Sequence, residues 1–440
     1  MTAAKKKILI LSDHPLVPSG VGTQARYLIQ GLLATGKYSI ICGGGAIKHQ
    51  NYTPQMVDPE KYGEDWKIFP VDGYGDKTFM RKILLHEKPD AVIIFTDPRF
   101  FVWLWEMEDE VRQVCPILYW HVWDNDPIPD FNKTFYESTD HVACLSLKTY
   151  GLLQGLKNYD RYSYIPHAIA PEVFKPIPEA EVQAFKKANY GPHGDRKFVL
   201  FWNNRNARRK MTGDVIASFA KFLKKVGKDN AVLMMHTSPT DQEGQDIVAL
   251  AKQFDIEKQL IISDRRIPPE EMNMFYNVAD CTINIASNEG FGLSTLESLM
   301  SGTPIVAHMT GGLQFQLGDW WEGISDFSDQ DKLTEIARSK KNIANWWGAP
   351  VYPAARNCTG SQQIPYIYDD RINHEDVVKA LLKVYEMGRD KRKKLGAQAS
   401  EWARKTFPMD KMISSWDALL QETLNNYTKA SGPEIRLVSI

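Results

Sequence analysis

Two glutamates, Glu289 and Glu297, stand eight residues apart in the segment SNEGFGLSTLE. The apolar run 281–285 before them predicts a buried strand, and apolar residues recur at helical spacing over 296–300. The glycine-containing stretch 290–293 is therefore expected to form a corner between a strand and a helix. Free backbone N–H groups at such a corner, together with the helix dipole, favour phosphate, and glycine lets a ligand approach closely. The segment predicts a site for a sugar attached to a diphosphate, with Glu297 placed to accept bonds from ribose hydroxyls.

A second group of charges follows the predicted strand 198–202. Arg205 and Lys210 would leave a parallel sheet at its carboxyl end, where two cations could neutralise a departing diphosphate. Each charge-assisted hydrogen bond of this kind is worth about 1.5 to 3 kcal/mol. The alternative is a solvated loop, because four of the six residues from 205 to 210 are cations. Similarly, Arg265 or Arg266 either faces a nucleobase or phosphate or belongs to a plain helix-entry loop.

The N-terminal segment 13–25 offers a competing interpretation. Gly20, Gly22 and Ala25 fit the spacing of a dinucleotide-binding fingerprint. However, the loop is long rather than a tight turn, and the next strand ends in three glycines, with no acidic residue to take ribose hydroxyls. These two features make an NAD-dependent enzyme the weaker alternative.

His121 follows the predicted strand 117–120 and is expected at its carboxyl end, facing a ligand cleft. A lone histidine in this place is either structural or a ligand contact. Asp124 and Asp126 have the spacing of a metal-binding Asp-x-Asp pair. Such short patterns are frequent by chance, and Pro127 favours a turn, so we expect no metal site.

Composition and charge exclude several classes of protein. A chain of 440 residues suits two domains of about 200 residues each. Lys and Arg number 53 against 54 Asp and Glu, which gives no field for nonspecific nucleic-acid binding. The five cysteines lie far apart without metal-ligand spacing and are expected to be reduced and buried. The first apolar run, 8–11, is too short for a signal peptide or membrane span, so we expect a cytoplasmic protein.

Short β-rich runs alternate with helical segments in two successive stretches, which predicts two parallel sheets with crossover helices. The expected strands are 8–11, 39–42, 91–95, 117–120 and 141–144 in the first stretch, and 198–202, 231–235, 260–262, 281–285 and 304–306 in the second. A proline-rich connector, 165–178, separates the stretches. Residues 314–370 depart from the alternation and are interpreted as an insertion whose tryptophans fill a small core or stack on sugar rings. Two amphipathic segments, about 389–405 and 408–425, close the chain.

The segment from Glu289 to Glu297 resembles the Glu-x7-Glu signature of retaining GT-B glycosyltransferases of the family-four type, and the resemblance covers nearly the whole chain. It implies an α/β fold of two Rossmann-like parallel-sheet domains that face a central cleft. The implied parts are an acceptor-side domain at 1–170, a nucleotide-sugar donor domain at 171–408, and a C-terminal helix at 409–440 that crosses back to the first domain.

The resemblance also assigns roles to individual residues. The spacing from Arg205 to Lys210 matches the family's donor-phosphate pair, although Asn204 and Met211 stand where the family commonly has glycine. The carried-over site comprises a catalytic set of His121, Glu289, Arg205 and Lys210, donor-binding residues Gly290, Phe291, Gly292, Leu293, Ser294, Glu297 and Arg266, and a loop beside the sugar and acceptor at Gly20, Val21 and Gly22.

The implied activity moves a sugar from a nucleotide-diphosphate sugar to an acceptor hydroxyl with retention of anomeric configuration. It requires no metal, no cofactor and no covalent nucleophile. A glycan, a lipid-linked saccharide, a small metabolite or a protein would suit as acceptor, and peripheral membrane contact is compatible with this. A modified nucleic acid is disfavoured by the neutral charge. The alternative is a catalytically silent GT-B protein that binds a nucleotide sugar or acts as a scaffold, but the intact set of two cations and two glutamates argues against it. The sugar, the nucleobase and the oligomeric state are left open.

Overall fold

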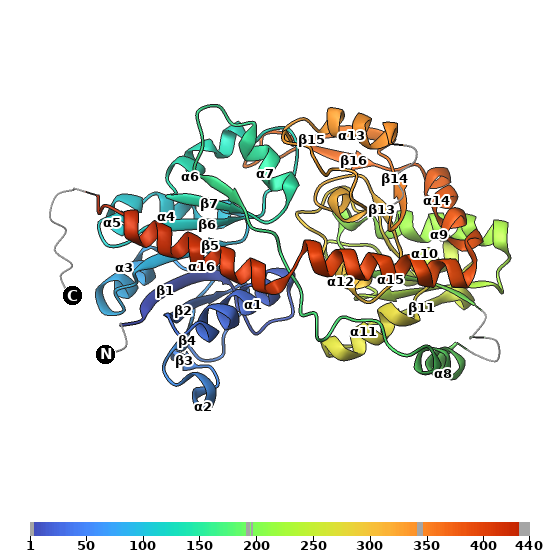
Figure 1. Cartoon of the computed structure of the whole chain (residues 1–440), viewed down its shortest axis with the longest axis horizontal. Helices are drawn as coiled ribbons and strands as arrows, with labels where there is room; N and C mark the ends of the chain where they lie inside the picture. The colour runs from blue at the N-terminus through green and yellow to red at the C-terminus, as the bar shows by residue number, and fades with distance from the viewer. Residues whose placement is uncertain (1–3, 191–193, 195–196, 341–345, 431–440) are drawn as a thin grey trace. The chain divides into compact units, whose positions relative to one another are not determined.

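The computed structural model describes residues 4–190, 194, 197–340 and 346–430 (Figure 1). The chain divides into two compact units. Unit 1 contains Met1–Trp123, Ile128–Ala168 and Met409–Ile440, and unit 2 contains Asp124–Pro127 and Ile169–Pro408. The domain boundaries predicted from the sequence lie after residues 170 and 408. The last ten residues of the predicted C-terminal segment lie outside the described residues.

Unit 1 is built on an eight-stranded sheet with the order β3-β4-β2-β1-β5-β6-β7-β8. All neighbouring strands are parallel except β3 and β4. The strands are β1 Lys6–Asp13, β2 Tyr38–Gly45, β3 Gln55–Met56, β4 Trp66–Pro70, β5 Ala91–Phe95, β6 Ile117–His121, β7 His141–Cys144 and β8 Tyr162–Tyr164. The central strands β5 and β6 are buried along their length, and β1 is buried from Ile8 onwards, which is expected of a parallel sheet covered on both faces.

Unit 2 contains a six-stranded parallel sheet with the order β11-β10-β9-β12-β13-β14. Its strands are β9 Phe198–Asn203, β10 Ala231–His236, β11 Leu260–Ser263, β12 Cys281–Asn284, β13 Ile305–His308 and β14 Gly348–Val351. The strand order reverses between β9 and β12, which are neighbours in the sheet although two strands separate them in sequence. Ligands of open α/β sheets bind outside the carboxyl ends of the strands at such a reversal.

Helices cross between the strands of both sheets. In unit 1 they are α1 Gly20–Ala34, α2 Pro59–Tyr62, α3 Lys77–His86, α4 Val102–Trp105, α5 Glu108–Arg112, α6 Lys133–Glu137, α7 Leu147–Gln154 and α16 Met409–Asn426. In unit 2 they are α8 Glu179–Asn189, α9 Thr212–Val226, α10 Ile247–Gln253, α11 Pro269–Val278, α12 Leu293–Met300, α13 Gln330–Ser339, α14 His374–Glu386 and α15 Gly388–Thr406. The predicted terminal helices, about 389–405 and 408–425, are thus confirmed as α15 and α16.

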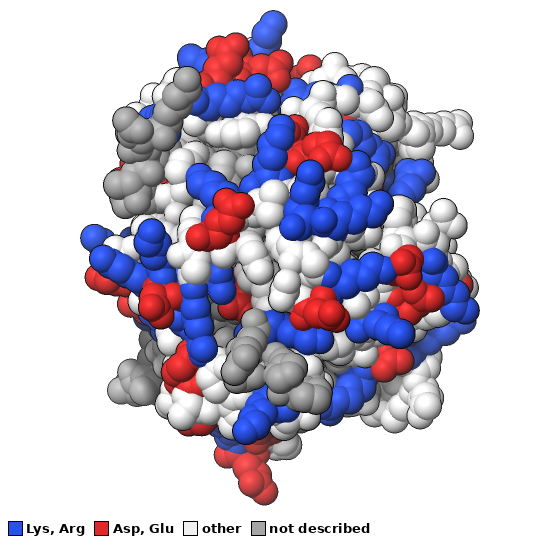
Figure 2. Space-filling model, turned by 90° about the vertical axis from the view of Figure 1, so that its right-hand side faces the viewer, with Lys and Arg blue, Asp and Glu red and all other residues white. Residues whose placement is uncertain are grey.

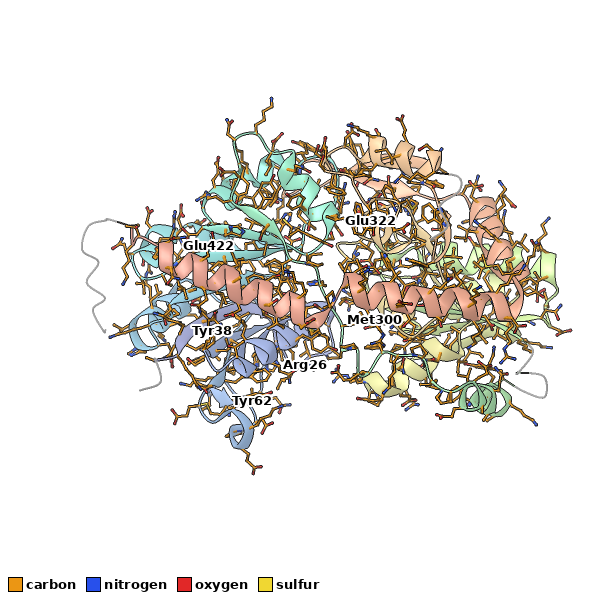
Figure 3. All side chains as sticks on the ribbon, in the orientation of Figure 1. Arg26, Tyr38, Tyr62, Met300, Glu322 and Glu422 are labelled. Atoms are coloured by element: carbon orange, nitrogen blue, oxygen red, sulfur yellow. The ribbon has the colours of Figure 1, made fainter. Side chains whose placement is uncertain are left out.

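The C-terminal helix α16 packs on unit 1. Trp416 is fully buried, with its ring centroid 5.2 Å from that of Trp120 on β6. The carboxylate of Asp417 accepts a hydrogen bond of 2.7 Å from the hydroxyl of Tyr38, which is labelled beside α16 in Figure 3. A Cβ on Gly31 of α1 would lie 2.3 Å from Cδ1 of Ile413, so the absence of a side chain permits this helix contact.

The interpretation of 314–370 as an insertion outside the alternation is wrong in part. The helix α13 and the strand β14 lie inside this range, and β14 pairs with β13 as an edge strand of the main sheet. The sequence signal was weak because β14 is only four residues long and contains Gly348 and Pro350. The hairpin of β15 Ala355–Thr359 and β16 Ile367–Arg371 does stand apart as its own two-stranded sheet. Trp320 is almost fully buried, so core filling is confirmed for this residue.

Candidate active site

Glu289 lies in the loop between β12 and α12, and its side chain is buried against two cations of the loop after β9. Its Oε1 accepts a short hydrogen bond from Nζ of Lys210, and its Oε2 accepts one of 3.1 Å from Nη1 of Arg209. Burial alone would raise the pKa of Glu289, but the charges of Lys210 and Arg209 hold it at about 2. The carboxylate is therefore ionised throughout the physiological range.

Lys210 has the opposite response to the same surroundings. Burial lowers the pKa of its ammonium to about 8, with a further decrease from the neighbouring Arg209 and a partial compensation by Glu289. Lys210 therefore keeps its charge at neutral pH mainly because Glu289 is ionised. The two buried groups depend on each other, and removal of either leaves an uncompensated charge.

Glu297 lies in the second turn of α12 and is held by a different kind of partner. The hydroxyl of Tyr276 on α11 donates a hydrogen bond of 2.6 Å to its Oε2, and Asn203 at the end of β9 donates one of 2.8 Å to the Tyr276 oxygen. Burial raises the pKa of Glu297 to about 7, and the hydrogen bond from Tyr276 opposes the increase only partly. Two glutamates eight residues apart thus have pKa values on opposite sides of the ordinary one.

The turn between the glutamates has the geometry of an anion site. Gly292 precedes α12 with a φ of 93°, a conformation that favours glycine, and no side chain caps the helix in the described structure. The N–H groups of Leu293 and Ser294 belong to the first turn, whose donors have no acceptors within the helix. Gly290, Phe291 and Gly292 form the loop that leads into this turn, which matches their predicted place.

A glycine pair after β13 supports this turn from behind. The N–H of Gly312 donates a hydrogen bond of 2.7 Å to the carbonyl of Glu289, and Nε2 of Gln316 donates one of 2.7 Å to the carbonyl of Phe291. Gly311 has a φ of 52°, and a Cβ there would lie 2.3 Å from the carbonyl oxygen of Glu289. The segment GGLQFQ is not among the predicted site residues, although its paired glycines are a signal of a close backbone approach.

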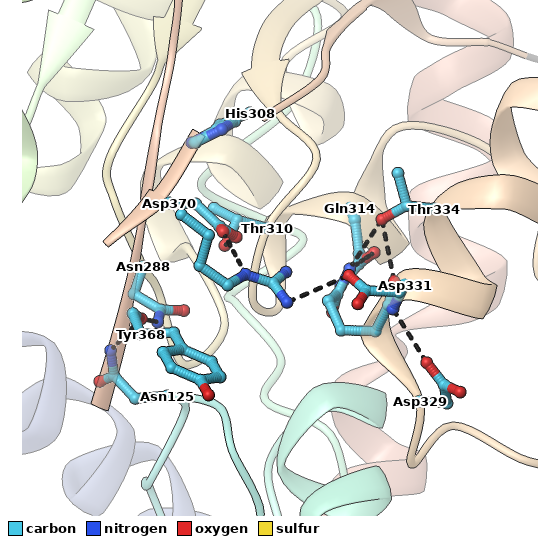
Figure 4. Close-up of polar contacts among 12 residues, drawn as sticks. Asn125, Asn288, His308, Thr310, Gln314, Asp329, Asp331, Thr334, Tyr368 and Asp370 are labelled. Carbon is cyan, nitrogen blue, oxygen red and sulfur yellow. Dashed lines mark hydrogen bonds and ion pairs between the residues drawn. The ribbon is translucent and has the colours of Figure 1, made fainter. Parts of the chain in front are cut away.

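The β15–β16 hairpin provides a second support, also missed by the sequence (Figure 4). Nδ2 of Asn288 donates a hydrogen bond of 3.4 Å to the carbonyl of Tyr368, which also accepts one of 3.1 Å from Nδ2 of Asn125. Asp370 on the same strand accepts hydrogen bonds from Thr310 at 2.7 Å and from Arg356 at 2.8 Å. These contacts connect the residue before Glu289 to a strand about 80 positions later.

The predicted cation pair divides in the structure. Lys210 is buried beside Glu289, whereas Arg205 is largely exposed and makes two hydrogen bonds of 2.9 Å to Asp241. The second cation beside Glu289 is instead Arg209, whose side chain is 54% exposed and which the sequence pattern does not distinguish from the other cations of its loop. Met211 has a φ of 55° at a position where the family commonly has glycine. The turn therefore has the left-handed backbone conformation that favours glycine, although its residue is methionine.

The Asp-x-Asp segment contributes charge to this cluster. Although Asp124 follows β6 in sequence, its negative charge contributes to the raised pKa of Arg209 and opposes the decrease that burial causes in the pKa of Lys210. Across residues 4–190, 194, 197–340 and 346–430, no group of three or more His, Cys, Asp or Glu side chains could hold a metal ion. Arg266 lies exposed in the loop before α11, where Arg265 forms an ion pair with Glu271.

The predicted site residues of unit 1 differ from expectation in two places. His121 was expected to face a cleft, but its side chain is fully buried, and Nε2 lies 2.9 Å from the hydroxyl of Tyr136. The reason is the alternation along β6, because His121 points to the same face as the buried Tyr119. Burial lowers the pKa of His121 to about 3, so the ring is neutral.

The predicted glycine loop is shorter than expected. Gly20, Val21 and Gly22 form the first turn of α1, and Oγ of Ser19 accepts a hydrogen bond of 2.9 Å from the N–H of Gly22. A Cβ on Gly22 would lie 2.8 Å from the carbonyl oxygen of His14. The loop therefore ends at Ser19, which caps the helix.

Two further expectations concern cysteines and membranes. Cys42, Cys115, Cys144 and Cys281 are buried as expected, but Cys358 on the hairpin strand β15 is exposed, so its predicted burial is wrong. Among the described residues, no helix combines the length and apolar character needed to cross a bilayer.

Comparison with known proteins supports the interpretation of unit 2 and of the whole fold. Residues 182–337 match the family model described as "Glycosyl transferases group 1". The trehalose synthase of Thermococcus litoralis is 21% identical over 280 residues, which cover 62% of this chain and 64% of that protein. The D-inositol 3-phosphate glycosyltransferase of Corynebacterium glutamicum is 35% identical over 142 residues, or 29% of this chain and 32% of that protein. The matched part thus spans less than two thirds of these relatives' length.

Solved structures confirm the GT-B fold over nearly the full length. Sucrose-phosphate synthase from Thermosynechococcus elongatus superposes with a TM-score of 0.67 at 14% identity, covering 96% of this chain and all of that one. The Anabaena protein HepE, in complex with UDP and glucose, gives a TM-score of 0.66 at 12% identity over 95% of this chain and 100% of its own. At these identities the likeness concerns the fold, and it confirms the two-domain α/β architecture predicted from the sequence.

Proposed function

We propose that this chain transfers a sugar from a nucleotide-diphosphate sugar to an acceptor hydroxyl, because it has the GT-B fold and its residues 182–337 match the model of the group 1 glycosyl transferases. The observation that carries the proposal is the contact of Glu289 with Lys210 and Arg209 at the reversal of strand order between β9 and β12. This point combines a helix start whose backbone N–H groups suit an anion, two cations, and a carboxylate that can accept hydrogen bonds from hydroxyl groups.

The donor would occupy the carboxyl edge of unit 2. Its diphosphate suits the N–H groups at the start of α12 together with Lys210, Arg209 and Arg205. The ribose would bind at Glu297, whose carboxylate can accept hydrogen bonds from two neighbouring ribose hydroxyls when they replace part of its hydrogen bonding with Tyr276. The transferred sugar would bind next to Glu289. HepE has been solved with UDP-glucose, so we take UDP-sugars as the first donors to test.

In the reaction, the bond between C1 of the sugar and the diphosphate oxygen breaks while C1 bonds to the acceptor oxygen. The acceptor proton leaves with the diphosphate. Negative charge grows on the leaving group, so the cations of the 205–210 loop stabilise the transition state more than the bound donor. Glu289, ionised and held by two cations, would position these cations before the donor arrives.

Retention and independence of metal belong to the same proposal. Resemblance to the family-four type supports retention, with the acceptor attacking from the face that the diphosphate leaves. Metal independence is supported by the cations around Glu289. They can neutralise the charge of the leaving diphosphate, which a divalent metal ion does in other transferases. Resemblance likewise supports an acceptor-binding role for Gly20, Val21 and Gly22 of unit 1, whereas His121 of the same unit is fully buried.

A screen of UDP-, GDP- and ADP-sugars by thermal shift tests the proposal. A donor at 100 times its dissociation constant should stabilise the protein by about 2.7 kcal/mol. Turnover should then be followed as release of nucleoside diphosphate, and the anomeric configuration of the product read by NMR. Binding without release of nucleotide in the presence of any acceptor class would favour a silent nucleotide-sugar protein. No shift with any donor would contradict the proposal.

A further inference from the structure

A basic surface lies on unit 2, at the first turns of α15. Five of the six residues from 389 to 394 are cations. Cations in the first turns of a helix are disfavoured by the helix dipole, so this arrangement costs stability unless each charge is compensated. Figure 2 shows the side of the molecule on which many Lys and Arg side chains gather.

Three of the five cations have acidic partners. Arg392 forms an ion pair of 2.9 Å with the buried Asp280, and Lys393 forms one of 2.9 Å with Glu179, which Arg389 also contacts. Lys391 and Lys394 take part in no ion pair between described residues. Asp390 stands four positions before Lys394, at helical spacing, yet the two side chains do not pair in the described structure.

Both unpartnered lysines line the same surface hollow, which has a volume of about 360 Å³. Lys391, Lys394, Leu395 and Gln398 follow the spacing of one helix face, and Lys383 reaches the hollow from the last turn of α14. Trp346 closes another side, and its backbone forms a bridge with Gly318. The lining thus combines three ammonium groups with one amide and an aromatic and aliphatic surface.

We propose that this hollow binds a phosphate-bearing group on a sugar-sized molecule or headgroup. The three lysines supply the charge that a phosphate dianion requires, and the ligand would compensate the like charges at the start of α15. The indole of Trp346 offers a flat apolar surface for the carbon face of a ring, and Gln398 can donate to or accept from a hydroxyl. The site is separate from the residues around Glu289 and does not depend on the proposed activity.

The test compares Lys391→Gln/Lys394→Gln with the matched control Lys224→Gln/Lys225→Gln. The control removes the same charge from exposed positions of α9 in the same unit. Binding of glucose 6-phosphate, inorganic phosphate and glucose is measured by calorimetry on the full chain. We expect the first variant to weaken glucose 6-phosphate binding about tenfold, as exposed ion pairs allow, and the control to leave it unchanged. Trp346→Leu should weaken glucose 6-phosphate but not inorganic phosphate.

A parallel arm distinguishes the two sources of the phosphate. Phosphatidylcholine vesicles with and without phosphatidylglycerol are sedimented with the protein. Binding to the anionic vesicles that Lys391→Gln/Lys394→Gln removes, and the control does not, assigns the site to a lipid headgroup. Binding of glucose 6-phosphate alone assigns it to a free metabolite. Equal binding in both double variants, loss of binding only in Lys210→Ala, or no binding of any probe overturns the proposal.

Discussion

The carboxyl edges of the two sheets have the same architecture but differ in how their charges are used. In unit 2, Lys210 and Arg209 meet Glu289 beside a glycine turn, and no side chain caps the helix that follows it in the described structure. In unit 1, the Asp13 carboxylate at the end of β1 already accepts hydrogen bonds from Ser19 at 2.5 Å and from Tyr74 at 2.9 Å. The cations of unit 2 thus pair with a carboxylate beside the start of a helix, where an anion can bind, whereas the carboxylate of unit 1 holds its own loops in place.

The largest expected effect therefore concerns the buried cation of unit 2. Lys210→Ala should lower kcat/KM by about 100-fold to 1,000-fold, the range observed when one preorganised donor to developing charge is removed. The variant also leaves Glu289 without its main counter-charge, so stability must be measured by denaturant unfolding alongside the rate.

Lys225→Ala, at an exposed position of α9, provides the matched control and should behave as wild type. Wild-type turnover in Lys210→Ala would remove the charge cluster of unit 2 from the mechanism and would end the contrast between the two sheet edges.

Arg209 and Arg208 provide a finer test within one loop. Arg209 donates to Glu289, whereas Arg208 is exposed and makes no side-chain contact with it in the described structure. Arg209→Gln removes the hydrogen bonds that the guanidinium donates to Glu289 and to the carbonyl of Asn288, and it should lower kcat/KM by about 10-fold to 100-fold. Arg208→Gln removes the same charge from the adjacent position and should change the rate little. Equal losses would mean that only the net charge of the loop matters.

The sequence predicted these elements to different degrees. All ten predicted strands occur, because the strands of buried parallel sheets are continuous apolar runs. The charge-bearing loops were found for a related reason, since the loops that contain Glu289 and Lys210 follow such runs. Arg209 was not singled out because four cations in six residues share one local pattern, and only the turn of the loop decides which one reaches Glu289.

The hairpin and the burial of His121 depend on contacts distant in sequence. Nothing near Tyr368 or Asp370 indicates that β16 would meet Ser287 and Asn288. Likewise, the position of His121 at the carboxyl end of its strand suggested that it faces a cleft, whereas the side-chain alternation of β6 turns it towards Tyr136. Local pattern predicts the elements, but the partners of a polar side chain follow from packing.

The two glutamates predict a pH dependence of donor binding. The pKa of Glu297 is raised from 4.5 to about 7, so its carboxylate forms only as the pH rises through 7. The KM for the donor should fall as the pH rises through about 7, and it should rise again above about 8, where Lys210 loses its proton. For stability the sign is opposite, because a raised folded-state pKa stabilises the protein at low pH and this contribution is lost between pH 4.5 and 7.

Two variants separate Glu297 from other groups in this profile. Tyr276→Phe removes the hydrogen bond that lowers the pKa of Glu297. The fall in KM near pH 7, the acidic limb of the profile, should therefore have its midpoint at higher pH. Glu297→Gln should abolish that limb and raise the KM at high pH, with the limb near pH 8 retained. An acidic limb that survives in Glu297→Gln would assign it to another group.

The smallest effect on activity is expected at His121. The ring is neutral and fully buried, so its direct contribution is to packing and to the hydrogen bond with Tyr136. His121→Phe leaves the Tyr136 hydroxyl without this partner and should lower the free energy of unfolding by about 1 to 3 kcal/mol. At a temperature where the variant is folded, kcat/KM should stay within about tenfold of wild type, below the range of a general acid or base. Tyr136→Phe removes the same hydrogen bond but keeps the histidine, and it should cost similar stability. If His121→Phe instead loses activity as severely as Lys210→Ala while Tyr136→Phe stays active, the histidine contacts the substrate, and the carboxyl edge of unit 1 carries chemistry as the edge of unit 2 does.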